Sequence, residues 1–380
     1  MNPLIELQAF GQSFWYDNIR RKFLKDGTVQ QLITNDGLRG MTANPAIFAK
    51  AIESGDEYDA QIMALAGEGT DPDGVYKALI LADIQLACDL FSEMYQKSGG
   101  AYGYVSLEVS PHLSDRTEET IDEARDWFAA VERPNVMIKV PATSAGIPAI
   151  RQLISDGINV NITLMFSMSH YEAVAQAYID GLTHFLQKGG DPGKVASVAS
   201  FFVSRVDTAV DRKLAALNDP AAEALLGKSA IANSKLVYQR FKELFLGDAI
   251  AELRAAGARP QRLLWASTST KNPDYPDTMY IDELIGAQTI NTMPPATIDA
   301  FRDHGRLGNT LEEEVEEAQL VLVKLGELGI DLHSVTEQLQ RDGIKAFARS
   351  FDGLLTTLAS KIARSRQSAV RLSEVGPGAP

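Results

Sequence analysis

Residues 135–143, N-V-M-I-K-V-P-A-T, contain a short apolar strand with one charged residue inside it. Asn135 and Pro141 bound the apolar run. Lysine is depleted in strands and is rarely fully buried unless it is paired. Desolvation lowers the pKa of an amine, and a neutral amine is a nucleophile toward carbonyls. The alternative is a lysine at a strand end whose ammonium group reaches solvent.

Other short strand-like segments, separated by helical patterns, lie on both sides of this one. They cover residues 12–19, 38–45, 102–109, 158–166, 195–203, 262–269 and 289–293. This alternation predicts a parallel sheet with helical crossovers. Eight such units favour an α/β fold of the closed (β/α)8 type, a TIM barrel, over an open doubly wound sheet. No G-x-G-x-x-G or Walker sequence follows a predicted strand, which argues against a nucleotide-binding sheet.

The ends of the chain add helices to this barrel. Residues 2–10 predict a leading helix, and residues 311–328 and 331–366 predict helices after the last strand. A chain of 380 residues has room for one large or two medium domains. Because no linker-like change of composition interrupts it, we expect a single barrel domain with C-terminal helices over residues 1–370. Residues 371–380 are expected to form a loose tail.

The composition is that of a soluble globular protein, with 45% hydrophobic and 23% charged residues. A net charge of -14 argues against nucleic acid and anionic membranes as partners. The lone cysteine, Cys88, lies in an apolar helical pattern and is expected in the core; a single cysteine suits a reducing cytoplasm. No signal peptide or membrane span is predicted, so we expect a cytoplasmic protein. The five histidines show no metal-ligand spacing, and neither a metal nor a cofactor is expected. The sequence is compatible with a homo-oligomer and does not specify an oligomeric state.

Polar side chains occur within or at the C-terminal ends of the predicted strands, where barrels build their active sites. They are Asp17, Asn44, Glu108, Lys139, Asn161, Thr163 and Ser200. Two carboxylates and a lysine supply an acid, a base and a nucleophile. Each residue also has a structural alternative: Asp17 as a helix cap, Glu108 in an ion pair, and Asn161 with Thr163 as hydrogen-bonding core residues.

Taken together, these segments make the chain resemble the transaldolase family, class I aldolases of the non-oxidative pentose phosphate pathway, in its longer bacterial subgroup. The matching segments are Y-D-N-I around Asp17, T-A-N-P around Asn44, S-L-E-V-S-P around Glu108, I-K-V-P-A-T around Lys139, N-I-T-L-M-F-S from Asn161 and S-F-F-V-S-R-V-D from Ser200. They extend from near the N-terminus to Asp207, and the similarity is weaker from there to the end.

The resemblance implies transfer of a dihydroxyacetone unit between sugar phosphates. Lys139 is expected to form a Schiff base with sedoheptulose 7-phosphate or fructose 6-phosphate, and Asp17 to take the C4 hydroxyl proton. Glu108 is expected to move protons during dehydration, through a water held by Thr163. The fragment then passes to glyceraldehyde 3-phosphate or erythrose 4-phosphate. The substrate-binding residues implied are Asn44, Asn161, Ser200, Phe202 and Arg205, with Arg205 near phosphate.

The segment after the seventh strand departs from the family pattern. Shorter members carry an A-S-F-R-type segment whose serine and arginine hold phosphate, whereas this chain has W-A-S-T-S-T-K-N. Ser267 matches the serine, and Lys271 stands two positions later than the arginine. A lysine holds phosphate as a point charge rather than as a fork. For Arg205 and Lys271 the alternative is a surface ion pair.

Two other functions are compatible with the same residues. A fructose 6-phosphate aldolase would release dihydroxyacetone to water, and a catalytically silent barrel would bind sugar phosphates as a sensor. The intact set of Lys139, Glu108 and Asp17 favours an enzyme over the silent barrel.

Overall fold

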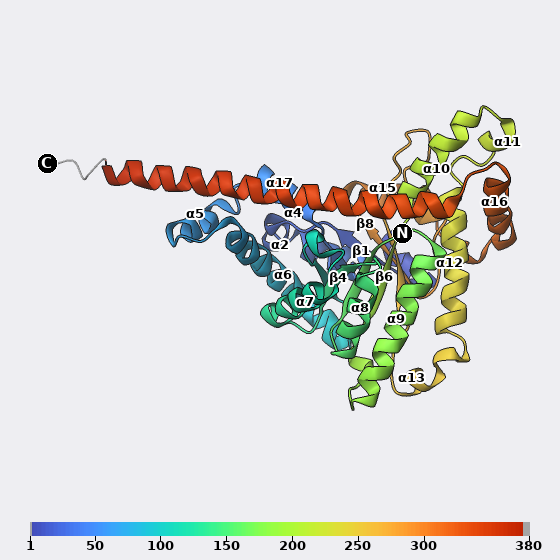
Figure 1. Ribbon diagram of the computed structural model, residues 1–380, viewed down its shortest axis with the longest axis horizontal. Helices are drawn as coiled ribbons and strands as arrows, with labels where there is room; N and C mark the ends of the chain where they lie inside the picture. The colour runs from blue at the N-terminus through green and yellow to red at the C-terminus, as the bar shows by residue number, and fades with distance from the viewer. Residues whose placement is uncertain (1, 375–380) are drawn as a thin grey trace.

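Eight parallel strands form a closed barrel in the computed structural model, which describes residues 2–374 (Figure 1). Each strand pairs with its neighbours in chain order, and β1 closes the barrel against β8. The strands are β1 (Gln12–Asp17), β2 (Gly40–Thr42), β3 (Tyr104–Glu108), β4 (Val136–Pro141), β5 (Val160–Met165), β6 (Ser197–Phe202), β7 (Arg262–Ala266) and β8 (Thr289–Met293). The predicted (β/α)8 barrel is therefore confirmed.

Several strands are shorter than predicted, and local chemistry explains where they stop. β2 ends at Thr42 because Asn44 caps the next helix: its side chain accepts a hydrogen bond from the Ile47 N–H, and Pro45 takes the first helical position. β7 ends at Ala266 because Ser267 adopts a left-handed φ of 56°, which strand geometry does not allow.

The register of the barrel places functional candidates side by side. Glu108 of β3 pairs with Lys139 of β4, and Lys139 pairs with Asn161 of β5. Paired residues of neighbouring strands project to the same face of a sheet. β5 carries a register irregularity between Ile162 and Met165, at which Leu164 has a φ of 60°.

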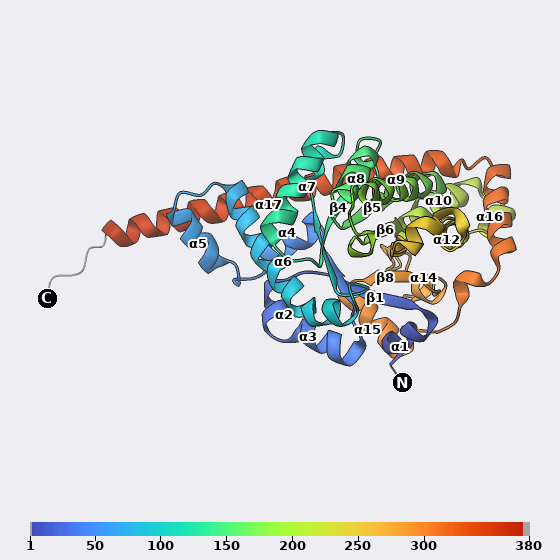
Figure 2. The same ribbon diagram turned by 90° about the horizontal axis from the view of Figure 1, so that it is seen from below.

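Helices connect the strands and cover the barrel (Figure 2). The α-helices up to β8 are α1 (Pro3–Glu6), α2 (Arg21–Lys25), α3 (Thr28–Gln31), α4 (Pro45–Ser54), α5 (Asp59–Gly67), α6 (Pro72–Lys97), α7 (Thr117–Val131), α8 (Gly146–Ser155), α9 (Met168–Gln187), α10 (Ser204–Leu217), α11 (Pro220–Glu223), α12 (Ser229–Phe245), α13 (Ala251–Ala255) and α14 (Met279–Asp282). Short helical turns are η1 (Leu7–Phe10), η2 (Leu32–Asp36), η3 (Pro111–Leu113), η4 (Pro192–Lys194), η5 (Asp248–Ile250) and η6 (Thr310–Glu312). The N-terminus of α9 is capped by the Ser167 side chain, which accepts a hydrogen bond from the His170 N–H.

Three α-helices follow β8: α15 (Pro295–His304), α16 (Val315–Glu327) and α17 (Leu332–Glu374). α17 runs along one side of the molecule, from α16 to beyond α5 (Figures 1 and 2). It is longer than the predicted helix, so residues 371–374 of the predicted tail are helical, and residues 375–380 lie outside the described residues. The single domain over residues 1–370 stays a prediction.

The hydrophobic core includes both the barrel interior and the layer between strands and helices. Cys88 of α6 is fully buried within it, as predicted. In the part of the chain that the structure describes, no helix is long and apolar enough to cross a membrane.

Candidate active site

A cavity of about 220 Å³ opens at the C-terminal ends of the strands. Strands, the loops that follow them and α17 all contribute to its walls. The predicted site residues that line it are Asp17, Asn44, Lys139, Ser200, Phe202, Arg205, Ser267 and Lys271. The remaining predicted residues, Glu108, Asn161 and Thr163, are buried beside it and are not part of its lining.

Lys139 points into this cavity and not toward bulk solvent. Its side chain is 6% exposed. The ammonium donates hydrogen bonds to the Ala43 carbonyl at 3.2 Å and to Glu108 Oε2 at 3.3 Å. Its Nζ lies 5.9 Å from the centre of the Phe347 ring, which belongs to α17. The alternative of a lysine that reaches solvent is therefore wrong for this residue.

Two carboxyl groups flank the lysine, and both have raised pKa values. Burial raises the pKa of Glu108 and outweighs the lowering by the positive charge of Lys139. Burial likewise raises the pKa of Asp17, again against the charge of Lys139. Asp17 accepts a hydrogen bond from the Thr42 hydroxyl at 2.8 Å. It caps no helix, because α2 begins only after Arg20.

Asn161 and Thr163 differ in how their polar atoms are satisfied. The Asn161 amide donates to Ser106 Oγ at 2.9 Å, and its carbonyl oxygen accepts from Ser200 Oγ at 2.7 Å. The Thr163 hydroxyl is buried without a protein partner among the described residues. A buried hydroxyl is rarely left unpaired, and an ordered water is its usual partner.

Two cationic groups, Arg205 and Lys271, also line the cavity. The guanidinium carbon of Arg205 lies 5.2 Å from the Phe202 ring centre, and Lys271 Nζ donates to Ser269 Oγ at 2.6 Å. Burial lowers the pKa of both cations, and the negative charge of Asp17 in the same cavity opposes this lowering. Ser267 Oγ lies 3.0 Å from Ser204 Oγ. The arrangement gives a local positive site in a protein of net charge -14.

Sequence reasoning missed several residues of the lining: Thr42, Ala266, Ser269, Thr292, Pro294 and Phe347. Thr42 and Thr292 are polar residues within predicted strands, and their hydroxyl oxygens lie 2.6 Å apart. That polarity in β2 and β8 was a usable signal. Phe347 gave none, because an aromatic residue on the apolar face of a long helix looks like any core residue.

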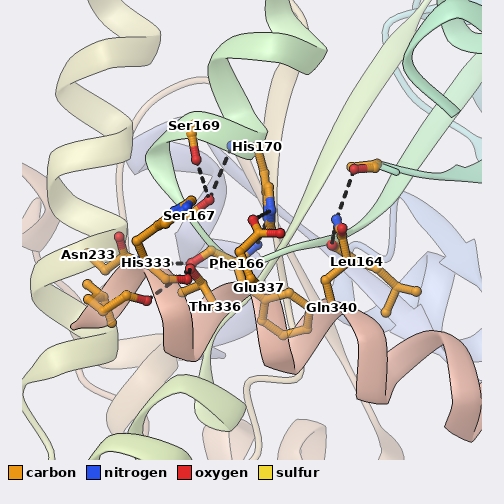
Figure 3. A network of polar contacts seen from close by, with 12 residues as sticks. Leu164, Phe166, Ser167, Ser169, His170, Asn233, His333, Thr336, Glu337 and Gln340 are labelled. Carbon is orange, nitrogen blue, oxygen red and sulfur yellow. Dashed lines mark hydrogen bonds and ion pairs between the residues drawn. The ribbon is translucent and has the colours of Figure 1, made fainter. Parts of the chain in front are cut away.

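A network of hydrogen bonds fixes α17 across the ends of the strands (Figure 3). The Gln340 amide donates to the carbonyls of Ala142 at 2.9 Å and Leu164 at 3.1 Å. His170 Nε2 lies 2.6 Å from a carboxylate oxygen of Glu337, and His170 Nδ1 accepts from the Phe166 N–H at 3.3 Å. These bonds tie α17 to the ends of β4 and β5, which places Phe347 in the cavity wall.

The fold and the site define a class of enzyme. A buried lysine that faces two carboxyl groups with raised pKa values can form an imine with a carbonyl substrate and exchange protons with it. The two cations that line the same cavity suit an anionic substrate.

Comparison with known proteins identifies the family. Residues 14–358 match the Transaldolase/Fructose-6-phosphate aldolase family. The chain is 46% identical to the transaldolase of Parafrankia sp. over 361 residues, which cover 95% of this chain and 98% of that protein. It is 45% identical to transaldolase 2 of Nostoc sp. over 373 residues (95% and 98%), and 45% identical to the transaldolase of Thiobacillus denitrificans over 358 residues (94% and 100%). The chain therefore belongs to the transaldolase/fructose-6-phosphate aldolase family, and its function is that of a transferase of the transaldolase type.

Proposed function

We propose that this enzyme transfers a dihydroxyacetone unit from a ketose phosphate to an aldose phosphate through a Schiff base on Lys139, in the non-oxidative pentose phosphate pathway. The donors are sedoheptulose 7-phosphate and fructose 6-phosphate, and the acceptors are glyceraldehyde 3-phosphate and erythrose 4-phosphate. The observation that carries this proposal is the buried Lys139 ammonium, 3.3 Å from Glu108 and on the wall of the same cavity as Asp17.

Imine formation begins when Lys139 passes a proton to Glu108, 3.3 Å away, and the neutral Nζ then attacks the ketose carbonyl carbon. The carbinolamine then loses water, which needs a proton on the departing hydroxyl. Glu108 supplies that proton through a water held by the Thr163 hydroxyl, which otherwise has no partner among the described residues. Burial raises the pKa of Glu108, which favours the protonated form that this step needs.

Cleavage and transfer use the second carboxylate. Asp17 takes the proton of the C4 hydroxyl, the C3–C4 bond breaks, and the aldose phosphate leaves. The three-carbon fragment stays on Lys139 as an enamine and adds to the aldehyde carbon of the acceptor. Asp17 returns its proton to the new hydroxyl, and hydrolysis of the imine frees the product.

The other cavity residues hold the substrate. Arg205, Lys271 and Ser267 bind the phosphate, since all three line the same cavity and two carry positive charge. Asn44, Asn161 and Ser200 hold hydroxyl groups of the fragment, and Phe202 packs beside them. A cytoplasmic location belongs to this proposal, since a chain with a single cysteine suits a reducing compartment.

Reductive trapping tests the nucleophile. Borohydride added to the enzyme with fructose 6-phosphate should attach a reduced three-carbon fragment to the peptide that contains Lys139, as read by mass spectrometry. Lys139→Met should carry no label. A label on another lysine, or none on the wild type, would falsify the mechanism.

A coupled assay separates transfer from simple aldol cleavage. Turnover of fructose 6-phosphate should depend on an aldose phosphate acceptor. Steady release of dihydroxyacetone without an acceptor would assign the aldolase activity instead.

A further inference from the structure

Three arginines cluster at the end of the barrel opposite the active site. Arg39 directly precedes β2, Arg262 begins β7, and Arg259 lies three residues before it. The guanidinium carbons of Arg39 and Arg262 lie 3.9 and 5.5 Å from the centre of the Tyr102 ring. Arg259, Arg262, Tyr102 and Tyr104 line a cavity of about 260 Å³ at this N-terminal face.

The hydrogen-bond acceptors that these arginines have found are all uncharged. Arg39 donates to the Gln8 side-chain carbonyl, Arg259 to two backbone carbonyls and Arg262 to the Ala101 carbonyl. Within residues 2–374 none of the three forms an ion pair, whereas other arginines of the protein do: Arg125, Arg133 and Arg240 each pair with a carboxylate. Unpaired positive charges so close together are unexpected in a chain with 50 acidic residues.

The positive charges of the three arginines repel one another, and a bound anion would offset this repulsion. Burial lowers the pKa of Arg262 to about 10, and the charges of Arg39 and Arg259 act in the same direction. Each guanidinium has five N–H groups, and most of these are unused in the described residues. The cavity has the volume of roughly eight waters at ~30 Å³ each, which is ample for one tetrahedral oxyanion.

We propose that this cavity, lined by Arg259, Arg262 and Tyr102 with Arg39 stacked on the Tyr102 ring, binds a phosphate-type oxyanion, either inorganic phosphate or the phosphoryl group of a small metabolite. Arginine forks match the geometry of phosphate oxygens. The site lies at the face of the barrel that catalysis does not use, so it is separate from the phosphate position proposed at Arg205. If these arginines had only a structural role, Arg259 would serve to cap the backbone carbonyls after α6, and no anion would bind.

Binding of inorganic phosphate by the full-length protein tests the proposal. Calorimetric titration at constant ionic strength uses an Arg205→Gln/Lys271→Gln background, which removes the cations of the active site. We expect saturable binding of one phosphate in that background. Adding Arg262→Gln should weaken it at least about tenfold, because a charge-assisted bidentate contact is lost. Arg125→Gln, which removes a partly exposed arginine of the outer surface, should leave the affinity unchanged.

The same titration distinguishes the two sources of the ligand. Tighter binding of glycerol 3-phosphate than of phosphate assigns a phosphorylated metabolite, and the reverse order assigns the free ion. No saturable binding in the background protein, or equal affinity with and without Arg262, overturns the proposal. If Arg262→Gln does not fold, wild-type crystals soaked in selenate give a second test. An anomalous peak is expected beside Tyr102 and Arg262, and an empty cavity there would refute the site.

Discussion

At the residue scale, the site depends on one amine held between two acids of unequal surroundings. Glu108 is buried next to Lys139 in the barrel register, while Asp17 lies on the cavity wall and is bound by Thr42. Burial raises the pKa of both carboxyl groups, which favours their protonated forms and makes their carboxylates stronger bases. Their positions predict different steps for the two groups.

Replacing each acid should separate these steps. Asp17→Ala should still form the trapped imine but turn over about 10²–10⁴ times more slowly, as is usual when a general base is lost. Glu108→Ala should slow imine formation itself. Rapid-quench borohydride trapping measures the first step and a coupled assay measures turnover. Near wild-type turnover in Asp17→Ala would show that its assignment is wrong.

The cationic wall predicts a selective defect. Arg205→Ala should raise the KM of phosphorylated ketoses much more than that of fructose, because only the phosphate loses its forked partner. Lys271→Ala should do the same to a smaller degree, since it is a mobile point charge. The ratio of kcat/KM for phosphorylated and unphosphorylated donors reports this directly. If the ratio is unchanged in Arg205→Ala, Arg205 does not bind the substrate phosphate.

At the element scale, the strands were easier to predict from the sequence than the position of α17, which contributes Phe347 to the cavity wall. Lys139, Glu108 and Asn161 could be found because each is a polar residue in an apolar strand, and parallel strands bring such residues to one end. Thr42 belongs to the same pattern and was overlooked. Phe347 could not be found, since its place in the wall depends on where α17 crosses the barrel. That crossing is set by long-range bonds such as those of Gln340, 198 residues from Ala142.

Gln340 should therefore matter more than its place on a helix suggests. Gln340→Leu leaves the Ala142 and Leu164 carbonyls without their donor and should lower the free energy of unfolding by about 1–3 kcal/mol. Activity should fall as well, because Phe347 loses its fixed position. Gln338→Leu is the matched control: its amide bonds to the exposed Asp342 one turn on. Equal unfolding midpoints in urea for the two variants would contradict this role.

At the scale of the whole molecule, stability should carry a pH dependence from a buried aspartate. Asp207 of α10 accepts hydrogen bonds from the Ala230 N–H at 2.7 Å and from the Tyr280 hydroxyl at 2.8 Å. Burial nevertheless raises its pKa from 3.8 to about 7. Because the folded state then binds the proton more tightly than the unfolded chain, this contribution to stability is fully present below about pH 4. It is lost as the pH rises toward 7.

Asp207→Asn removes that titration and gives the test. When the pH is raised from 5 to 8, the free energy of unfolding of the variant should increase relative to that of the wild type. The increase should be on the order of a few kcal/mol at most. Urea unfolding at both pH values measures the change, with Asp115→Asn as an exposed control. A difference between variant and wild type that is the same at both pH values would exclude Asp207 as the source.

The closure of the barrel also bears on how the protein is made. Gln12 of β1 bonds to Thr289 of β8 across 277 residues. β1 therefore cannot pair with β8 until most of the chain has been synthesised. Phe347 emerges later still. A nascent chain of this enzyme therefore carries an open sheet with two unpaired edges for most of its synthesis, and such edges invite pairing with other chains. Protection by chaperones during translation should matter more for this protein than its closed native form suggests.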